Sequence, residues 1–470
     1  MRDIGFFFNP KSFAVIGASA NPKKGGNIVI RNLQEFGYRG AIYPINPKGG
    51  VIADLQAYPS LKDVPGDVEL AMIVIPRDRV PTAVRECGEK GVRGVIISTA
   101  GFSDSGEEVG RGLEDEVRDI AEQFGMRIMG PNSIGTINAT DGFVTSITTL
   151  RSPENAGAVS FFGQTGMFAS GFFRWITSSQ HFAVSKVACL GNKTDVDETD
   201  ILAHLGDDPE TSVVGVYFEG VSRGRAFLKT IREVSRKKPV VVLKSGRTEK
   251  GARAVSSHTG TLAGEDGVYD GVFQATGAVR VDDFDHFYDC LKAFSFVPLP
   301  RGRRLGVVSI TGVGCVLTAD YADLYGLEIP GLSDEGTTRM REVFPDWARV
   351  SNPVDMWFAI ENVGPRRAYE VITEALAREE KVDMVLAIFT LIPESDFNAG
   401  EIFDAIRKKY PDTPILACFM GGELSQYSRW REEFERQGIP VFPGPGRAVF
   451  AASAIVRYAE FLASDRETPV

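Results

Sequence analysis

The sequence predicts an α/β protein made of three doubly wound domains, each with a mainly parallel sheet covered by helices. Short runs rich in valine and isoleucine alternate with longer amphipathic stretches along the chain, and this alternation is typical of βαβ units. The chain has 470 residues. Because single domains rarely exceed about 250 residues, two to four domains are expected.

Residues 1–140 are predicted to form a Rossmann-like domain. Ligands of open parallel sheets bind beyond the carboxyl ends of the strands, so the turns after its strands should line one crevice. The strands are expected at residues 13–16, 41–45, 70–75, 94–97 and 127–129, with helices near 27–36 and 107–124.

Residues 150–296 and 303–470 are predicted to form two further parallel-sheet domains. Proline, glycine and arginine occur together in residues 297–304, which indicates a linker. Strands are expected at 158–162, 184–190, 212–218 and 240–243 before this linker, and at 305–310, 384–389 and 415–419 after it.

A weak internal repeat links these two domains. Residues 159–166 (VSFFGQTG) and 308–314 (VSITGVG) each read as a strand, a turn of small residues and a helix start. Such a helix start presents backbone N–H groups and a positive dipole end to an anion. Two anion sites are therefore predicted, one at Gln164, Thr165 and Gly166 and the other at Gly312, Val313 and Gly314.

Composition excludes several classes of protein. The net charge of −10 argues against nucleic-acid binding, which needs a surplus of lysine and arginine. The five cysteines show no CxxC pair, as expected for buried thiols in a reducing compartment. The N-terminus lacks a signal-peptide pattern and no apolar stretch could span a bilayer, so we expect a cytoplasmic protein without membrane contact. The four histidines lack metal-ligand spacing, and no metal site is predicted.

The turn after the first strand is glycine-rich but does not match a dinucleotide fingerprint. After Gly17, the positions of the second and third glycines of GxGxxG are occupied by Ser19 and Pro22. NAD sites usually place an acidic residue at the end of the second strand, whereas this chain has Asn46-Pro47-Lys48. Lysine suits a phosphorylated ribose such as that of coenzyme A, and Lys23 adds positive charge. A purely structural turn and an NAD-dependent dehydrogenase remain alternatives.

One histidine, His258, has an unusual setting. Small hydroxyl and glycine residues surround it in a predicted loop, residues 256–264 (SSHTGTLAG). Imidazole is a good phosphate nucleophile near neutral pH, and a carboxylate that holds its other nitrogen fixes the tautomer. Glu219, at the carboxyl end of an apolar strand, is the predicted partner, although a helix cap or a surface acid is an alternative for it.

These motifs together resemble a known family. In chain order they are GAS from residue 17, NPK from 46, GPN from 130, LGNKTDVD from 190, YFEG from 217 and SHTG from 257. Nearly the whole chain, including SNPVD from residue 351, resembles the α subunit of ADP-forming acetate- and acyl-CoA synthetases, relatives of succinyl-CoA synthetase. The resemblance implies a CoA-binding first domain and two flavodoxin-like ligase domains.

The resemblance also implies a reversible reaction in which acyl-CoA, phosphate and ADP give the free acid, CoA and ATP. An acyl phosphate forms first, and His258, oriented by Glu219, then carries the phosphoryl group. The phosphate would be held by the two predicted anion sites and by Thr259 and Gly260. CoA would be bound by Gly17, Ala18, Ser19, Lys23, Asn46, Lys48, Ile75, Pro76, Ala100, Gly101 and Asn132.

The chain departs from the family pattern at Ser133, where cysteine is frequent, at Thr165-Gly166 and at Ile310–Val313. These changes are expected to surround the CoA thiol and the phosphate. Aromatic residues such as Trp175 and Trp357 could bound an acyl pocket, although core positions are the alternative.

No segment of the size of an ATP-grasp domain is apparent in the chain. We therefore expect a separate ATP-grasp β chain that binds ADP or ATP with Mg, in an α2β2 assembly. The substrate would be a small organic acid or its CoA thioester. A non-catalytic CoA-binding regulator of the same fold is the alternative function.

Overall fold

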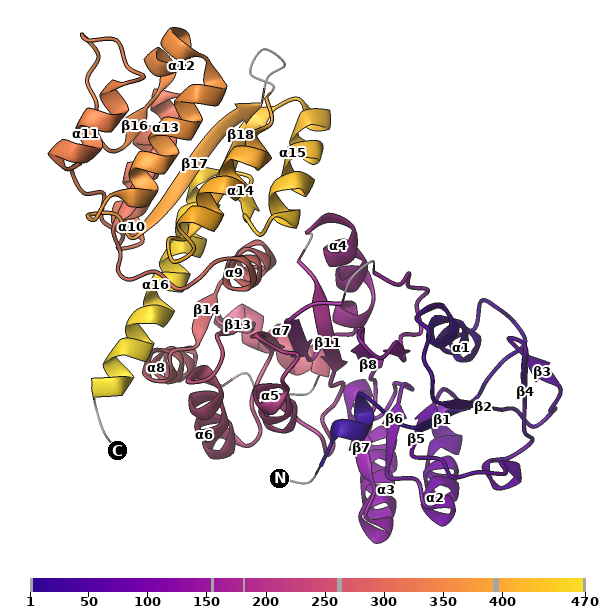
Figure 1. Cartoon of the computed structure of the whole chain (residues 1–470). Coiled ribbons are helices and arrows are strands. Elements are labelled where there is room, and N and C mark those ends of the chain that lie inside the picture. The colour runs from indigo at the N-terminus through magenta and orange to yellow at the C-terminus, as the bar shows by residue number, and fades with distance from the viewer. Residues whose placement is uncertain (1–2, 154–155, 181, 260–263, 392–396, 468–470) are drawn as a thin grey trace. The chain divides into compact units, whose positions relative to one another are not determined.

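The computed structural model describes residues 3–153, 156–180, 182–259, 264–391 and 397–467. The chain divides into two compact units, Met1–Asp282 and Asp283–Val470 (Figure 1). Each unit is described by itself. No helix in the described ranges is both long and apolar enough to cross a membrane.

The first unit begins with a five-stranded parallel sheet in the order β2-β1-β5-β6-β7. The five strands predicted for this part of the chain are confirmed. Their bounds are β1 (Ser12–Ile16), β2 (Ala41–Ile45), β5 (Leu70–Ile73), β6 (Gly94–Ile97) and β7 (Arg127–Met129), and a hairpin of β3 (Val51–Ile52) and β4 (Leu55–Gln56) follows β2.

Three helices connect these strands, α1 (Gly25–Glu35), α2 (Val80–Lys90) and α3 (Glu108–Phe124). The last two end where Gly91 and Gly125 adopt left-handed φ values of 81° and 68°, a conformation that glycine adopts at low cost. Short 3-10 turns η3 (Arg77–Arg79) and η4 (Ser103–Ser105) follow β5 and β6.

A second sheet of the first unit has seven strands in the order β14-β13-β12-β10-β11-β8-β9. Its parallel part consists of β10 (Val159–Gly163), β11 (Val184–Cys189), β12 (Val213–Phe218), β13 (Val240–Lys244) and β14 (Val279–Val281). Its helices are η5 (Gly166–Ala169), α4 (Gly171–Ser179), α5 (Glu198–Asp207), α6 (Gly224–Ser235), α7 (Glu249–Thr259) and α8 (Asp266–Thr276).

Two short antiparallel strands, β8 (Gly135–Asn138) and β9 (Phe143–Val144), extend this sheet beyond β11. They directly follow the last strand of the first sheet, so the chain enters the second sheet without a separate linker. The two sheets also share one hydrophobic core, to which Phe13 and Met129 contribute from one side and Val196 and Phe218 from the other. This shared core explains why the two sheets form one unit.

The second unit contains a five-stranded parallel sheet in the order β16-β15-β17-β18-β19. The strands are β15 (Leu305–Ser309), β16 (Val354–Asp355), β17 (Met384–Leu391), β18 (Ile415–Gly422) and β19 (Val441–Phe442). The helices are α9 (Phe284–Phe296), α10 (Gly312–Leu324), α11 (Asp334–Arg341), α12 (Trp357–Val363), α13 (Pro365–Arg378), α14 (Ala399–Lys409), α15 (Leu424–Arg436) and α16 (Pro445–Glu467).

The helix α9 belongs to the second unit, although the predicted second domain extends to residue 296. It packs on α16, and its Lys292 forms a fully buried ion pair with Glu435 of α15. The predicted domain limits 1–140, 150–296 and 303–470 remain predictions, since the units are defined by packing alone.

The parallel strands of all three sheets follow one order, 2-1-3-4-5, counted along the chain within each sheet. In this order the connections leave the first strand in opposite directions, and a crevice opens between the carboxyl ends of strands one and three. These positions lie between β1 and β5, between β10 and β12, and between β15 and β17. At these three crevices, predicted site residues follow β1, β5, β10, β12 and β15.

The helix α5 illustrates how charge stabilises this architecture. Its N-cap residue Asp197 accepts hydrogen bonds from the N–H groups of Thr199 (2.8 Å) and Asp200 (3.3 Å) and from the Arg223 guanidinium. Burial raises the pKa of the Asp197 carboxyl, but the hydrogen bonds and charge of Arg223 outweigh burial and hold it below its usual value.

Replacing Asp197 with alanine removes the cap and should lower the free energy of unfolding at pH 7 by about 2 kcal/mol. The melting temperature should fall by several degrees as a result. The folded-state pKa is depressed, so this stabilisation is present above about pH 4 and is lost as the pH falls through the folded-state value. The difference from the wild type should therefore shrink in acid, as thermal unfolding followed by circular dichroism would show. Asp207→Ala, at the exposed end of the same helix, should have little effect, and equal effects of the two variants would contradict this account.

Candidate active site

The turn after β1 fits tightly between neighbouring strands. Gly17 has a φ of 95°, and a Cβ atom there would lie 2.3 Å from the carbonyl oxygen of Val74. Its N–H donates to the carbonyl of Ile45 at 3.2 Å. Only glycine fits this position, and the turn lies at the crevice between β1 and β5.

Hydrogen bonds join the other predicted CoA-binding turns along the same edge. The Asn46 side chain donates to the Ala18 carbonyl (2.7 Å). The Thr99 hydroxyl donates to the Ile75 carbonyl (2.6 Å), and the Asn132 N–H donates to the Thr99 carbonyl (3.0 Å). The structure therefore brings the turns after β1, β2, β5, β6 and β7 into one continuous edge. Pro76 and Ala100 are exposed on it, and Gly101 is held through its carbonyl by Arg77.

The start of α1 packs backbone to backbone against the first turn. A Cβ atom at Gly26 would lie 2.4 Å from the Gly17 carbonyl oxygen, and the Asn27 side chain donates to the Ser19 carbonyl (2.7 Å). The positive end of an 11-residue helix therefore lies beside this turn. Lys23 and Lys48 are both exposed, so their ammonium groups are accessible to a phosphate.

Ser133 was expected to lie near the ligand, but its side chain does not face this edge. Its side chain is buried, donates to the Cys189 carbonyl (2.5 Å) and accepts from the Gly135 N–H (2.9 Å). The hydroxyl ties the end of the first sheet to β11. The expectation that residue 133 lies at the ligand is therefore wrong, because its side chain points into the junction between the two sheets.

Gln164 and Glu219 meet at the carboxyl edge of the second sheet, where β10 and β12 end. The Gln164 side-chain oxygen accepts hydrogen bonds from the N–H groups of Glu219 (2.8 Å) and Gly220 (3.4 Å). Gln164 is only 4% exposed, and its Nε2 group has no hydrogen-bond partner among the described residues. A buried amide donor is thus available beside the Glu219 main chain.

The Glu219 side chain is also buried, at 4% exposure. Its Oε1 atom lies 3.4 Å from the hydroxyl of Tyr217, which is 3.2 Å from the hydroxyl of Ser245 at the end of β13. Burial raises the pKa of Tyr217 and keeps its hydroxyl protonated. The carboxylate is thus not a surface acid, and the N-cap position of the next helix, α6, is occupied by Arg223.

The predicted helix start after Gly166 is only partly correct. Thr165 caps a single 3-10 turn, η5, by accepting from the Met167 N–H (3.2 Å), and α4 begins later, at Gly171. Ser170 interrupts the helix with φ −140° and ψ −103°, and its hydroxyl donates to the Gly166 carbonyl (2.8 Å). A short turn rather than an α-helix therefore follows β10 at the predicted anion site.

A buried lysine, Lys244, ends β13 at the same edge and was not among the predicted site residues. It pairs in register with Phe218, the residue before Glu219. Its ammonium group donates to the Ser245 carbonyl (2.6 Å) and lies 4.7 Å from the centre of the Tyr269 ring. Burial lowers the pKa of Lys244. A lysine that closes a run of valine and leucine was the signal for it in the sequence.

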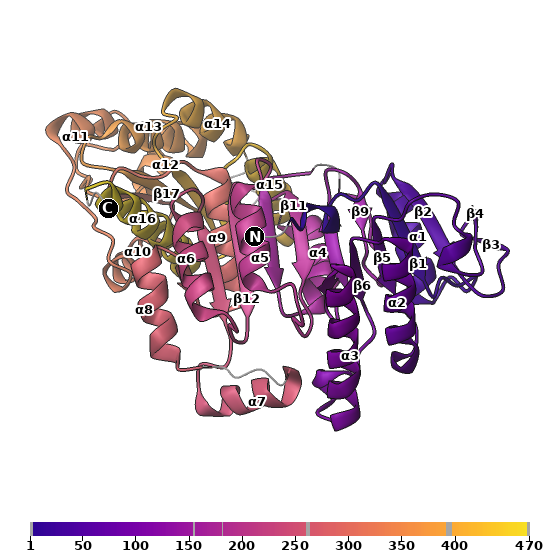
Figure 2. The same cartoon turned by 90° about the horizontal axis from the view of Figure 1, so that it is seen from below.

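His258 lies in the last turn of α7, which the structure extends to Thr259 where the sequence predicted a loop. Glu249, Ala252 and Ala254 favour a helix there. The side chains of residues 256–259, and the predicted phosphate ligand Gly260, lie outside the described part of the chain. The helix stands clear of α5 and α6 (Figure 2) and contacts η4, the turn that follows β6.

The second predicted anion site lies in the second unit. As predicted, α10 begins at Gly312, and its cap Thr311 accepts from the Gly314 N–H (3.3 Å). Val313 is 56% exposed, and the Asp355 carboxylate would lie 3.0 Å from a Cβ atom at Gly312. The helix start is thus open to a ligand but carries an acidic neighbour.

Trp175 and Trp357, two of the aromatic residues considered for an acyl pocket, belong to different units. Phe173 is fully buried in the core, whereas Trp175 is 52% exposed on α4. Trp357 and Phe358 are exposed on the second unit. No acyl pocket is therefore assigned to these side chains.

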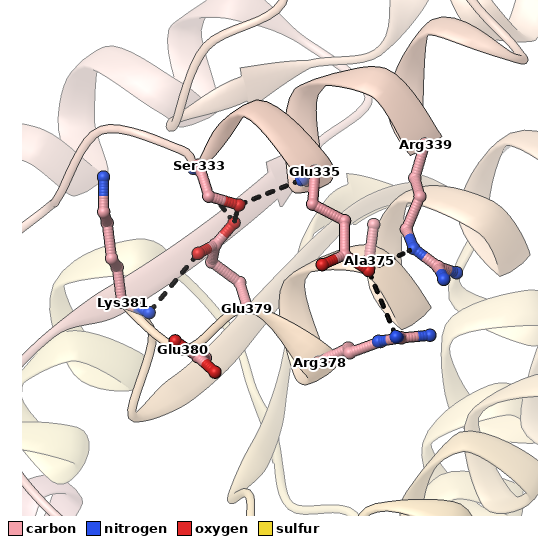
Figure 3. A pocket seen from close by; sticks show the side chains of 9 residues that line it. Ser333, Glu335, Arg339, Ala375, Arg378, Glu379, Glu380 and Lys381 are labelled. Carbon is pink, nitrogen blue, oxygen red and sulfur yellow. Dashed lines mark hydrogen bonds and ion pairs between the residues drawn. The ribbon is translucent and has the colours of Figure 1, made fainter.

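A pocket of about 260 Å³ lies in the second unit at the start of α11 (Figure 3). Two of its charged groups, Arg339 and Arg378, lie 3.3 and 3.1 Å from the Glu335 carboxylate. Ser333 donates to Glu379 at 2.7 Å. None of the predicted site residues lines this pocket, and its two arginines already share the Glu335 carboxylate.

Comparison with known proteins agrees with this arrangement. Residues 11–139 match the model of a CoA binding domain, and residues 156–294 match that of a succinyl-CoA ligase like flavodoxin domain. The chain is 38% identical to acetate–CoA ligase (ADP-forming) II of Archaeoglobus fulgidus, over 97% of this chain and 67% of that protein. It is 36% identical to the α subunit of acetate–CoA ligase (ADP-forming) II of Pyrococcus furiosus, over 97% of this chain and 98% of that one.

A solved structure is also similar. The acetyl-coenzyme A synthetase 1 of Ca. Korarchaeum cryptofilum, determined in complex with phosphate and ADP, superposes with a TM-score of 0.90 and 30% identity and covers 100% of both chains. The fold and the edge residues define a CoA-binding subunit of an acid–CoA ligase. The chain belongs to the family of ADP-forming acetate–CoA ligase α subunits. The alternative of a non-catalytic regulator is not favoured, since the relatives are named as ligases.

If Lys48 binds the 3′-phosphate of CoA as predicted, replacing it with glutamine should weaken CoA binding about tenfold, because one charge-assisted contact is removed. Binding of 3′-dephospho-CoA should be unchanged, and isothermal titration calorimetry with both ligands measures the difference. Lys11→Gln, at the opposite end of β1, is the control. Equal losses for both ligands would show that Lys48 does not read the 3′-phosphate.

Proposed function

We propose that this chain is the α subunit of a ligase that interconverts acyl-CoA, phosphate and ADP with acid, CoA and ATP through an acyl phosphate and a phosphohistidine. The observation that supports this most is the pairing of Gln164 and Glu219 at the carboxyl edge of β10 and β12. The strand β13 of the same sheet leads into the helix that carries His258. In this proposal the segments that carry the catalytic groups follow the neighbouring strands β10, β12 and β13.

In the first step, a phosphate oxygen attacks the thioester carbonyl. The carbon–sulfur bond breaks, CoA leaves as the thiol after protonation, and an acyl phosphate remains. In this proposal the edge formed by Gly17, Asn46, Lys48 and Asn132 holds CoA, with Lys23 on its phosphates. Gln164 supplies an amide donor for a phosphate oxygen.

In the second step, an imidazole nitrogen of His258 attacks phosphorus and the acid leaves as its carboxylate. Glu219 accepts a hydrogen bond from the other ring nitrogen and stabilises the charge that develops on the ring. Thr259 and Gly260 are proposed to bind phosphoryl oxygens, as is the start of α10 with Gly312, Val313 and Gly314. The turn η4 follows β6 at the edge that carries the predicted CoA-binding turns (the CoA edge). Its contact with α7, the helix that carries His258, supports a route from the CoA edge to the histidine.

The nucleotide site is proposed to lie on a separate ATP-grasp β chain, with Mg bound alongside ADP or ATP in an α2β2 assembly. The Pyrococcus furiosus relative is named as an α subunit and is matched over nearly its whole length. The Archaeoglobus fulgidus relative is matched over 67% of its length, so one longer chain in the family carries additional sequence. Acetate is the first acid to test, because the names of these relatives specify it.

Incubation with acetyl-CoA and labelled phosphate should give protein-bound phosphate that is stable to base and labile to acid. Replacing His258 with alanine should abolish this signal, because the attacking nitrogen is removed. Phosphopeptide mapping with and without the substitution measures the effect, and His286→Gln should retain the label. Undiminished labelling of His258→Ala would exclude the assigned role.

Replacing Gln164 with methionine should slow phosphoprotein formation about 100-fold, because one change removes the amide donor and the acceptor of the Glu219 N–H. The affinity for CoA should stay within about twofold, since Gln164 lies at the other sheet. Single-turnover kinetics together with calorimetry separate the two effects. A loss of CoA affinity without a slower phosphoryl transfer would contradict the assignment.

A further inference from the structure

A single segment, residues 190–197, connects the CoA edge of the first sheet to the carboxyl edge of the second sheet at Glu219 (the Glu219 edge). It rests on the turn after β7, with the Asn192 N–H donating to the Pro131 carbonyl (2.9 Å) and the Thr194 N–H to the Gly130 carbonyl (3.2 Å). A Cβ atom at Gly191 would lie 2.0 Å from the Pro131 oxygen, so the two backbones are in direct contact.

Two neighbouring side chains of this segment contact different parts of the first unit. Asn192 donates to Asp104 (3.0 Å) and Glu114 (3.0 Å) in the first domain. Lys193 instead contacts the part of the chain that belongs to the second sheet. Its ammonium group donates to the Gly220 carbonyl (2.8 Å) and lies 3.0 Å from the Glu198 carboxylate. The Lys193 and Glu198 side chains are 2% and 0% exposed.

The loop after β12 is consequently held from two directions. The Gln164 side chain accepts from the N–H groups of Glu219 and Gly220. Lys193 binds the Gly220 carbonyl, and Glu198 accepts from the Ser222 N–H at 3.2 Å. The main chain that carries Glu219 has little freedom to move.

Stability alone does not explain this buried pair. Removing a lysine and a carboxylate from water costs more than their attraction returns in many proteins, and apolar replacements of similar volume are often neutral. Burial also raises the pKa of Glu198, and the Lys193 charge opposes this.

The backbone of Lys193 supports a functional role as well. It has a φ of 61°, one of four positive values at non-glycine residues in the described chain. Two of the others, Ala53 and Asp54, lie in the β3–β4 hairpin turn, where such values are expected. The remaining two, Asn132 and Lys193, belong to the two backbone segments that contact each other here, residues 130–132 and 190–197. Uncommon backbone conformations persist where a site requires them.

We propose that Lys193 is a positioning residue for phosphoryl transfer, which holds the Gly220 carbonyl and thereby fixes Glu219 against its histidine. This role rests on the proposed function, in which Glu219 orients His258. Lys193 does not touch the reacting atoms. Its effect is on the rate of transfer rather than on the binding of acyl-CoA.

The test compares two double variants that each remove a buried ion pair. Lys193→Met/Glu198→Gln removes the contact with Gly220 but keeps an acceptor for Ser222. Lys292→Met/Glu435→Gln is the matched control, because that pair is 1% and 0% exposed and its lysine also donates to a main-chain carbonyl. Single-turnover phosphoprotein formation from acetyl-CoA and labelled phosphate is measured with the melting temperature of each variant.

The first double variant should form phosphoprotein at least about tenfold more slowly than the control, with half-saturation by acetyl-CoA within about twofold. Equal rates for the two variants would overturn the role of Lys193 while leaving the proposed function intact. Absence of phosphoprotein in the wild type would overturn both. If the first double variant does not fold, Lys193→Gln and Lys292→Gln provide the same comparison with the carboxylates retained.

Discussion

The backbone contact between Gly191 and Pro131 is the constraint on which the site of this chain depends. No side chain fits between these two backbone segments. Glycine at position 191 also provides the φ of 62° that the turn needs. The contact fixes the segment 190–197 at the junction of two sheets. From there Asn192 supports the CoA edge and Lys193 supports the Glu219 edge, so chemistry that needs both edges is carried by one packed unit.

The three sheets explain where function lies in this fold. Each places a crevice between the carboxyl ends of its first and third parallel strands, and the chain fills these crevices differently. Beside β1 it provides glycine and a helix start suited to a phosphorylated cofactor. Beside β10 it provides a buried amide and a buried carboxylate, and beside β15 it provides a capped helix start next to Asp355. One architecture thus supports both the proposed CoA-binding edge and the proposed reaction edge.

Much of this arrangement could be predicted from the sequence, because strands of parallel sheets are continuous apolar runs and their ends carry the site. Gly17, Gln164 and Glu219 were found in this way. The antiparallel strands β8 and β9 were not predicted, since each is too short to show a period. The burial of Ser133 could not be predicted either, because it depends on a contact with β11, which lies far along the chain.

The lysines were missed for a related reason. Charged residues are predicted to be solvated, and only the folded chain shows that Lys193 and Lys244 are enclosed with partners. The last turn of α7, residues 256–259, was predicted as part of a loop because small residues near His258 outweighed the helix-forming residues before them. Local composition therefore singled out His258 but not the element that carries it.

The central claim is that phosphate attacks the acyl group and its phosphoryl then passes to the protein. Single turnover of the wild type with acetyl-CoA and 18O-labelled phosphate tests this most directly. If the claim is correct, the released acetate contains one phosphate-derived 18O atom, and the protein gains one phosphoryl group for each acetate formed. Unlabelled acetate, or labelled acetate without phosphoprotein, would contradict it.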